Sequence, residues 1–181
     1  MERNIEMLVF NKVTTYSATD PFRKFVPVLP VLLIPLVSLD LYDLMGLILV
    51  NGKHGTSYFG RQNFRDIVTV PTEAYLMLDV DNGSEHLNTP ASLSEDRIRT
   101  KGRSPHTILE GALHVLVFPE KFTAHNINLC GSRGKDETIP HILLHDRNGP
   151  RLGRHFTDYP SPVWGTPSCA IRATQKDLFL R

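Results

Sequence analysis

The residues best suited to chemistry gather near the end of the chain, between His141 and Cys169. This stretch contains three histidines, three arginines, two aspartates, the only tryptophan and one of the two cysteines, placed around the turn Asn148-Gly149. Histidine titrates near neutral pH, and guanidinium groups can bind and polarise a small molecule. Such a density of functional groups is typical of a small active site, and it also fits a hairpin followed by an ordered tail.

His155 and Asp158 are the pair in this stretch best suited to proton transfer. A carboxylate three residues after an imidazole can orient the ring or raise its pKa, so that the ring acts as a general base or acid. Tyr159 is the third catalytic candidate, and with Arg154 it can bind or polarise a carbonyl oxygen. The competing interpretation is a loop held by local hydrogen bonds.

Three further residues are candidates for substrate binding. Arg133 follows Gly131-Ser132, and this turn can hold a carboxylate or phosphate through its amides and the guanidinium; the alternative is a solvent-facing arginine. Trp164 can form the floor of a pocket or fill the core. Cys169 can line a pocket, or act as a nucleophile if a histidine lowers its pKa, whereas a buried structural thiol is the alternative.

A metal site is a weaker hypothesis. His141 and His145 lie four residues apart and share one face of a predicted strand, and His155 or Asp158 across the hairpin would add further ligands. The spacing matches no established zinc pattern, so we expect scattered histidines and no metal. Neither a phosphate-binding glycine loop nor a Gly-x-Ser-x-Gly motif occurs, and we therefore expect no cofactor and no serine-hydrolase chemistry.

The composition argues against several classes of partner. Twenty basic and 19 acidic residues give a formal net charge of +1, which offers no electrostatic footprint for nucleic acid. The most apolar run, Phe25–Val50, is interrupted by prolines and aspartates and lacks the roughly 20 apolar residues of a membrane span. No signal peptide is recognisable at the N-terminus, and we expect a cytoplasmic protein with reduced thiols.

The elements that must position these residues indicate an α+β fold: a single domain with a mostly antiparallel sheet and two or three helices packed on one face. Residues 1–24 are expected to be a lead-in, and residues 25–181 the domain. Helices are expected over Leu41–Met45 with Ser38 as cap, over Ser92–Lys101 with a Ser92–Glu95 capping box, and from Thr107 to Pro119 with a Thr107–Glu110 capping box.

Alternating or continuous apolar runs predict the strands of this sheet. Val26–Leu36, rich in prolines, is expected to be extended and to lie along a sheet edge. The other expected strands are Leu47–Val50 before the turn Asn51-Gly52, Thr56–Phe59, Ala74–Asp81, Asn126–Cys130, Ile139–His145 paired with Arg151–Phe156, and Cys169–Ala173.

Four segments together resemble an uncharacterised bacterial, actinobacterial-type domain family of unknown function. They are Tyr75–Gly83, Gly102–Gly111, the Gly-Ser-Arg of Cys130–Arg133, and the Trp-Gly-x-x-Ser-Cys of Trp164–Cys169. The resemblance covers Phe25 to Ala170 and implies one continuous domain, but it carries no known activity. The chain departs from the family pattern where Arg154-His155-Phe156 replaces Trp-Cys-Trp after a Leu-Gly pair, which implies a more polar pocket.

Three functions of different classes compete on these observations. The first is a cofactor-independent isomerase, cyclase or lyase acting on a small, largely apolar organic molecule, for instance in natural-product biosynthesis. The second is a binding or sensing module that uses the same pocket without chemistry. The third is a protein–protein adaptor or homodimer in which Val26–Leu36 forms an exposed edge.

Overall fold

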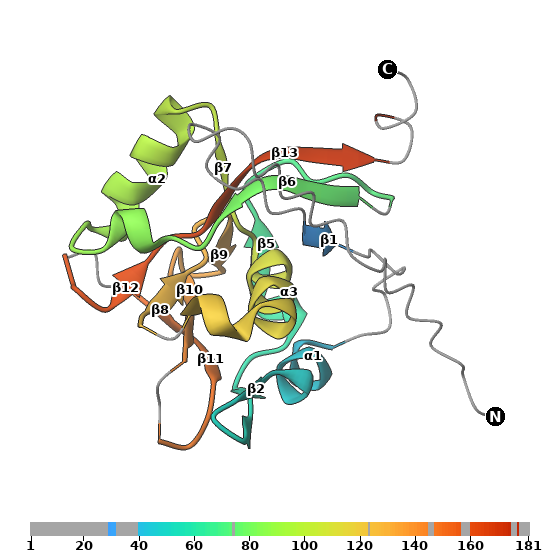
Figure 1. Ribbon diagram of the computed structural model, residues 1–181, viewed down its shortest axis with the longest axis vertical. Helices are drawn as coiled ribbons and strands as arrows, with labels where there is room; N and C mark the ends of the chain where they lie inside the picture. The colour runs from blue at the N-terminus through green and yellow to red at the C-terminus, as the bar shows by residue number, and fades with distance from the viewer. Residues whose placement is uncertain are drawn as a thin grey trace, which may run out of the picture.

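A computed structural model describes residues 40–73, 75–122, 124–144, 147–156, 160–174 and 177, and the backbone of residues 29–31 (Figure 1). Within these residues the chain forms three α-helices and several mostly antiparallel sheets, which confirms the α+β class. The helices are α1 Leu41–Leu47, α2 Ala91–Thr100 and α3 Ile108–Val117, and the 3-10 turns are η1 Arg61–Asn63, η2 Ser84–His86 and η3 Pro119–Phe122.

The larger strands belong to two separate sheets. The first is antiparallel and has the order β1 Leu29–Val31, β6 Tyr75–Asp81, β13 Ser168–Thr174, β7 Ser104–Pro105. The second has the order β12 Trp164–Gly165, β8 Asn126–Asn128, β10 Ile139–Leu143, β11 Arg151–His155, β4 Thr56–Ser57, with its two outer strands parallel to their neighbours. Two-stranded ladders join β2 Leu49–Val50 to β3 Lys53–His54, and β5 Phe64–Asp66 to β9 Ser132–Gly134.

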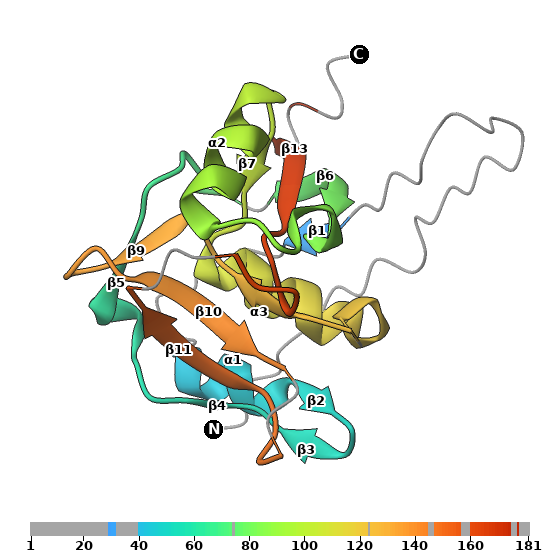
Figure 2. The ribbon, with the colours of Figure 1, turned by 90° about the vertical axis from the view of Figure 1, so that its left-hand side faces the viewer.

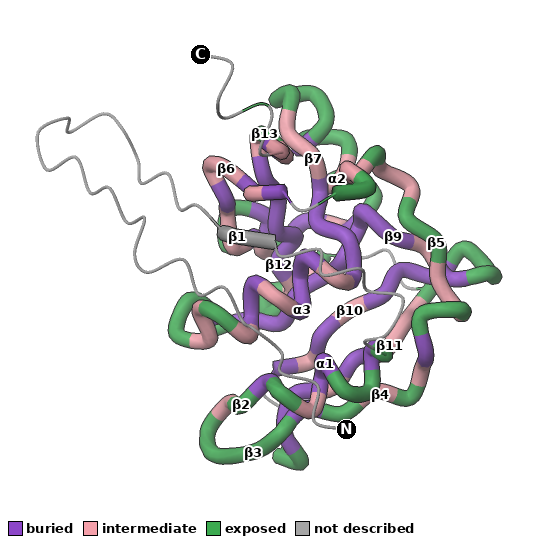
Figure 3. The backbone as a smooth tube through the Cα atoms, turned by 90° about the vertical axis from the view of Figure 1, so that its right-hand side faces the viewer, coloured by how far each residue is buried: buried purple, intermediate pink, exposed green. Residues whose placement is uncertain are grey.

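Helix α3 packs on both of the larger sheets (Figures 1 and 2). Its start is fixed by the predicted capping box, in which Thr107 Oγ1 accepts from Glu110 N and the Glu110 carboxylate accepts from Thr107 N. Apolar side chains of α3 and α1 pack on the five-stranded sheet to form the main core, and Figure 3 shows buried residues in both helices beside exposed ones in α1. Leu113 of α3 also packs on the second core, around Met77 and Cys169 of the four-stranded sheet. The strands predicted for a single sheet thus form two larger sheets, and helix α3 packs against both of them.

Turn residues determine the hairpins as expected. Asn51 and Gly52 both have positive φ, 51° and 74°, as the tight turn between β2 and β3 requires. Gly149, with φ 102°, follows Asn148 in the connection between β10 and β11. The predicted edge strand within Val26–Leu36 is confirmed for Leu29–Val31, which pairs with β6 at the sheet edge.

Helix α2 forms where it was predicted, but its expected cap is wrong. It begins at Ala91, and its N-cap residue is Pro90, which makes no side-chain cap hydrogen bond. The Glu95 carboxylate binds Arg99 and Arg133 instead of a backbone amide, because both guanidinium groups lie within its reach.

The described part of the chain contains no helix long and apolar enough to cross a membrane.

Candidate functional site

The candidate site lies on the outer face of the five-stranded sheet, and the register of β8, β10 and β11 places its residues. Side chains alternate between the faces of a strand, so Ile127, Ile142 and Leu152 point to the core while their neighbours point outward. His141 of β10 stands opposite Asn128 of β8 on one side and opposite Gly153 of β11 on the other.

Four side chains form what we call the histidine–tryptophan cluster: Asn128, His141, His155 and Trp164. The centroids of the His141 and His155 rings are 4.9 Å apart, and Trp164 lies 4.9 Å from the first ring and 5.7 Å from the second. The His141 ring crosses the indole nearly at right angles, at 72°, which is a favourable aromatic geometry. The three rings therefore contact one another across three strands.

A small residue is required opposite His141. A Cβ atom placed on Gly153 would lie 2.7 Å from Nε2 and 3.1 Å from Cε1 of His141. The imidazole therefore occupies the space that any other side chain at position 153 would take.

Asn128 fixes the tautomer of His155. The Nε2 atom of His155 lies 3.1 Å from Oδ1 of Asn128, and an amide oxygen can only accept a hydrogen bond. Nε2–H therefore donates, and in the neutral ring the lone pair lies on Nδ1. A general base needs a fixed tautomer of this kind, and Nδ1 of His155 is itself buried in the cluster.

His141 is held neutral by its surroundings. Burial lowers its pKa to about 3, and the nearby His155 and Arg151 act in the same direction because they disfavour a further positive charge. Its Nδ1 atom is buried and has no hydrogen-bond partner among the described residues. A neutral imidazole can donate or accept a hydrogen bond without changing its own charge, although the buried Nδ1 atom is not accessible to a ligand in this arrangement.

The structure brings together two of the residues selected from the sequence, His155 and Trp164. Arg133 is engaged elsewhere, by the Glu95 carboxylate of α2 and by the carbonyls of Cys130 and Ser132. Arg154 alternates with His155 along β11, and it binds Asp136 at 2.8 Å and lies over the ring of Phe59. Neither arginine belongs to the histidine–tryptophan cluster.

Cys169 also lies apart from the cluster, in the core beside Tyr75, Met77 and Val80. Burial raises the pKa of this thiol to about 12, so it is not a thiolate at neutral pH. The other two catalytic candidates, Asp158 and Tyr159, lie outside the described residues, as does His145.

Asn128 is the member of the site that the sequence prediction missed. The alternation Asn126-Ile127-Asn128 could have indicated this residue. Because Ile127 faces the core, both asparagines lie on the opposite face of the strand. The sequence pattern indicates His141 only as a metal ligand. The described residues contain no group of three or more histidine, cysteine, aspartate or glutamate side chains able to hold a metal ion.

The fold and the cluster together define an α+β domain with a pair of imidazoles held against an indole on the outer face of a sheet. The chain belongs to a family of unknown function (DUF5701), whose model matches residues 7–175. This membership confirms the predicted resemblance to an uncharacterised domain family. The chain matches no curated protein and no solved structure.

Proposed function

We propose that the histidine–tryptophan cluster is the active site of a cofactor-independent enzyme of the isomerase, cyclase or lyase type. Its substrate is a small, flat and largely apolar organic molecule. His155 is the general base in this proposal, and the observation that carries it is the hydrogen bond from His155 Nε2 to Asn128, which leaves Nδ1 with the lone pair.

The other residues of the cluster support distinct parts of such a reaction. Trp164 offers a flat apolar surface on which a planar molecule can stack, and the exposed apolar side chains Phe156 and Val163 directly adjoin His155 and Trp164 in the chain. The neutral His141 can donate a hydrogen bond to a carbonyl oxygen as negative charge develops on it.

In an isomerisation, His155 removes a proton from the carbon next to a carbonyl group, giving an imidazolium and an enolate. Where the substrate carries a C=C bond beside that carbon, the enolate extends over the double bond, and the same imidazolium returns the proton to the far carbon of that bond, so no oxidant or reductant is needed. Asp158 and Tyr159 remain part of the proposal from the sequence, as partners that orient the imidazole or polarise the carbonyl.

The experiment uses Trp164, the only tryptophan of the chain, as a reporter of binding. Small cyclic ketones with exchangeable α-protons are titrated against tryptophan fluorescence, and their exchange in deuterated water is followed by NMR. We expect saturable binding and accelerated exchange. His155→Gln should retain binding and lose at least about 100-fold in exchange rate, the usual contribution of a general base.

The matched control is His54→Gln, because His54 is an exposed histidine of β3. It should leave both binding and exchange unchanged. Exchange that is equally fast in His155→Gln would contradict the role of His155. Binding without exchange in the unaltered protein would favour the alternative, a non-catalytic binding or sensing module that uses the same surface.

Three finer attributes belong to the same proposal: a bacterial, actinobacterial-type origin, a cytoplasmic location and a role in natural-product biosynthesis. The adaptor or homodimer reading has one specific observation in its favour, which is the position of β1 at the edge of the four-stranded sheet. A strand at an edge can pair with a second chain.

A further inference from the structure

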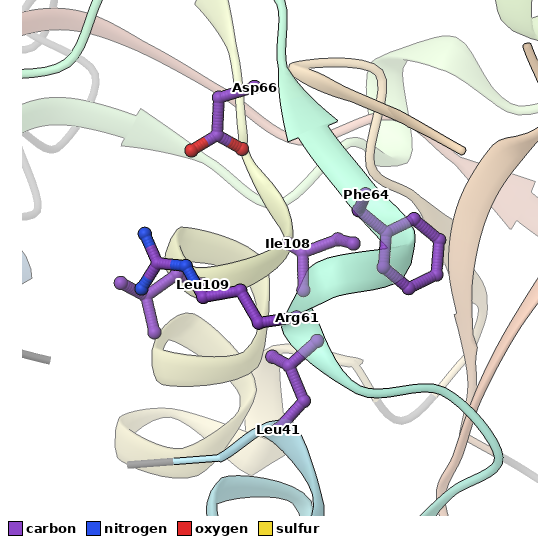
Figure 4. A pocket seen from close by; sticks show the side chains of 6 residues that line it. All are labelled: Leu41, Arg61, Phe64, Asp66, Ile108 and Leu109. Carbon is purple, nitrogen blue, oxygen red and sulfur yellow. The ribbon is translucent and has the colours of Figure 1, made fainter. Parts of the chain in front are cut away.

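A second candidate site lies away from the histidine–tryptophan cluster, at the beginning of helix α3. Figure 4 shows a hollow between the starts of α1 and α3 and the segment of η1 and β5. Its cavity volume is about 40 Å³, and six residues line it: Leu41, Arg61, Phe64, Asp66, Ile108 and Leu109. Four of these are apolar, whereas Arg61 and Asp66 bring opposite charges to the same hollow.

Asp66 is held in place by a buried hydroxyl. Pairing of β5 with β9 sets Asp66 opposite Ser132, which is fully buried. Ser132 Oγ donates to Asp66 Oδ1 at 2.5 Å and accepts from the backbone N–H of Ile108 at 3.0 Å. One carboxylate oxygen is therefore occupied, and the described residues give Oδ2 no hydrogen bond.

Arg61 stands at the start of η1 and is exposed. Its guanidinium makes no hydrogen bond or ion pair with the part of the chain that the structure describes, and it does not pair with Asp66. By contrast, Arg65 on β5 is bound by Glu137 at 2.6 Å. The Arg61 guanidinium and the Asp66 Oδ2 atom can thus each bind a ligand group of opposite charge at the same apolar hollow.

Asp66 is an exposed residue, but partial desolvation of its carboxyl group raises its pKa, while Ser132 and Arg61 act in the opposite direction. A cation placed against Oδ2 would favour the carboxylate form further. A ligand with only a negative charge would be repelled by Asp66, and a ligand with only a positive charge by Arg61. A ligand with both charges can satisfy each side chain.

We propose that this hollow binds a small zwitterion of the α-amino-acid class with a compact apolar side chain. The ligand carboxylate pairs with Arg61 and the ammonium with Asp66 Oδ2. Its side chain lies against the wall formed by Leu41, Phe64 and Leu109. This site is independent of the proposed reaction at the histidine–tryptophan cluster.

The test compares three probes that differ in one charged group: L-valine, isobutylamine without the carboxylate, and isovalerate without the ammonium. Binding to the full chain is measured by calorimetry and by NMR shift changes. We expect L-valine to bind at least about tenfold more tightly than either analogue, since each analogue loses one charge-assisted contact. Asp66→Asn, which keeps an acceptor for Ser132, should abolish the preference for L-valine over isovalerate, and Arg61→Gln should abolish the preference over isobutylamine.

Arg65→Gln is the matched control, because it removes a neighbouring arginine that already has a partner. It should leave L-valine binding unchanged. Arg61→Gln alters an exposed side chain and should fold normally, as the emission of Trp164 would verify. The proposal is overturned if L-valine fails to bind at about 10 mM, if an analogue binds equally well, or if Arg65→Gln weakens binding as much as Arg61→Gln.

Discussion

Arg172 of β13 donates hydrogen bonds to both carboxylate oxygens of Glu110 on α3. Its Nε atom lies 2.6 Å from one oxygen, and a terminal nitrogen lies 2.8 Å from the other. Glu110 is fully buried, and the Arg172 side chain is only 8% exposed. Tyr75 of β6 donates a third hydrogen bond to Glu110 at 2.8 Å, and Thr107 N donates a fourth at the same distance. This network ties the four-stranded sheet to the start of the central helix.

Breaking the pair from one side should be more harmful than removing it altogether. Glu110→Ala leaves a buried guanidinium without its partner and should lower the free energy of unfolding by about 3–5 kcal/mol. The double variant Glu110→Met, Arg172→Met removes both charges and should be less destabilising than Glu110→Ala. Urea denaturation measures these variants together with the single substitutions Glu110→Met and Arg172→Met, and a double variant whose cost equals the sum of these two single Met substitutions would show that the residues are not coupled.

The same residues show how far sequence reasoning reaches. The Thr107–Glu110 spacing correctly predicted a capping box, because capping depends on residues within one turn. It did not show that Glu110 would also bind Arg172, since that contact depends on how β13 packs on α3. The same pattern at Ser92 and Glu95 failed, because the helix begins at Ala91 and Ser92 lies inside it, while Glu95 binds Arg99 and Arg133.

Part of the candidate site could also be predicted from the sequence, and part could not. Period-two patterns and the Asn148-Gly149 turn correctly predicted the β10–β11 hairpin that holds His141 and His155. Register, the neighbouring β8 strand and the parallel addition of β12 determine that Asn128 and Trp164 join them. Non-local pairings of this kind are set by the packing of the whole core, and a local pattern does not contain them.

A buried histidine pair should make the stability depend on pH. His106 Nε2 and His114 Nδ1 are 3.3 Å apart, and burial lowers the pKa of His106 to about 3 and that of His114 well below its usual value. A histidine in the unfolded chain has a pKa of about 6.5. Below that pH the unfolded chain binds protons that the folded protein does not, so the free energy of unfolding falls as the solution is acidified.

Each such histidine should contribute up to about 1.4 kcal/mol per pH unit between about pH 6 and pH 4, and nothing to the slope above about pH 7. Denaturation at a series of pH values measures this slope. His106→Gln should flatten the slope, whatever its effect on absolute stability, while the exposed His54→Gln should keep it. An unchanged slope in His106→Gln would show that this ring does not govern the acid sensitivity.

Two glycines should respond to alanine in opposite ways. At Gly153 a methyl group would collide with the His141 ring, so Gly153→Ala should cost about 1–3 kcal/mol and shift the emission of Trp164 as the ring moves. At Gly46, inside α1, no atom beyond the chain neighbours and the helix's own backbone lies within 4 Å of the added carbon. Gly46→Ala should raise the free energy of unfolding by about 0.5–1 kcal/mol and leave the emission unchanged. If Gly153→Ala changed neither the free energy of unfolding nor the emission of Trp164, the cluster would not be closely packed.

The two cysteines should be protected from alkylation in the folded protein. Cys130 and Cys169 are both buried thiols without a disulfide, in separate clusters of the core. Because burial raises the pKa of Cys169 to about 12, very little of it is a thiolate at pH 8. Iodoacetamide at pH 8, followed by mass spectrometry, should therefore label the native chain at the rate of unfolding and label both cysteines at once in guanidinium chloride. Rapid selective labelling of Cys169 in the native protein would instead indicate an activated thiol and would support the hypothesis that Cys169 is a nucleophile.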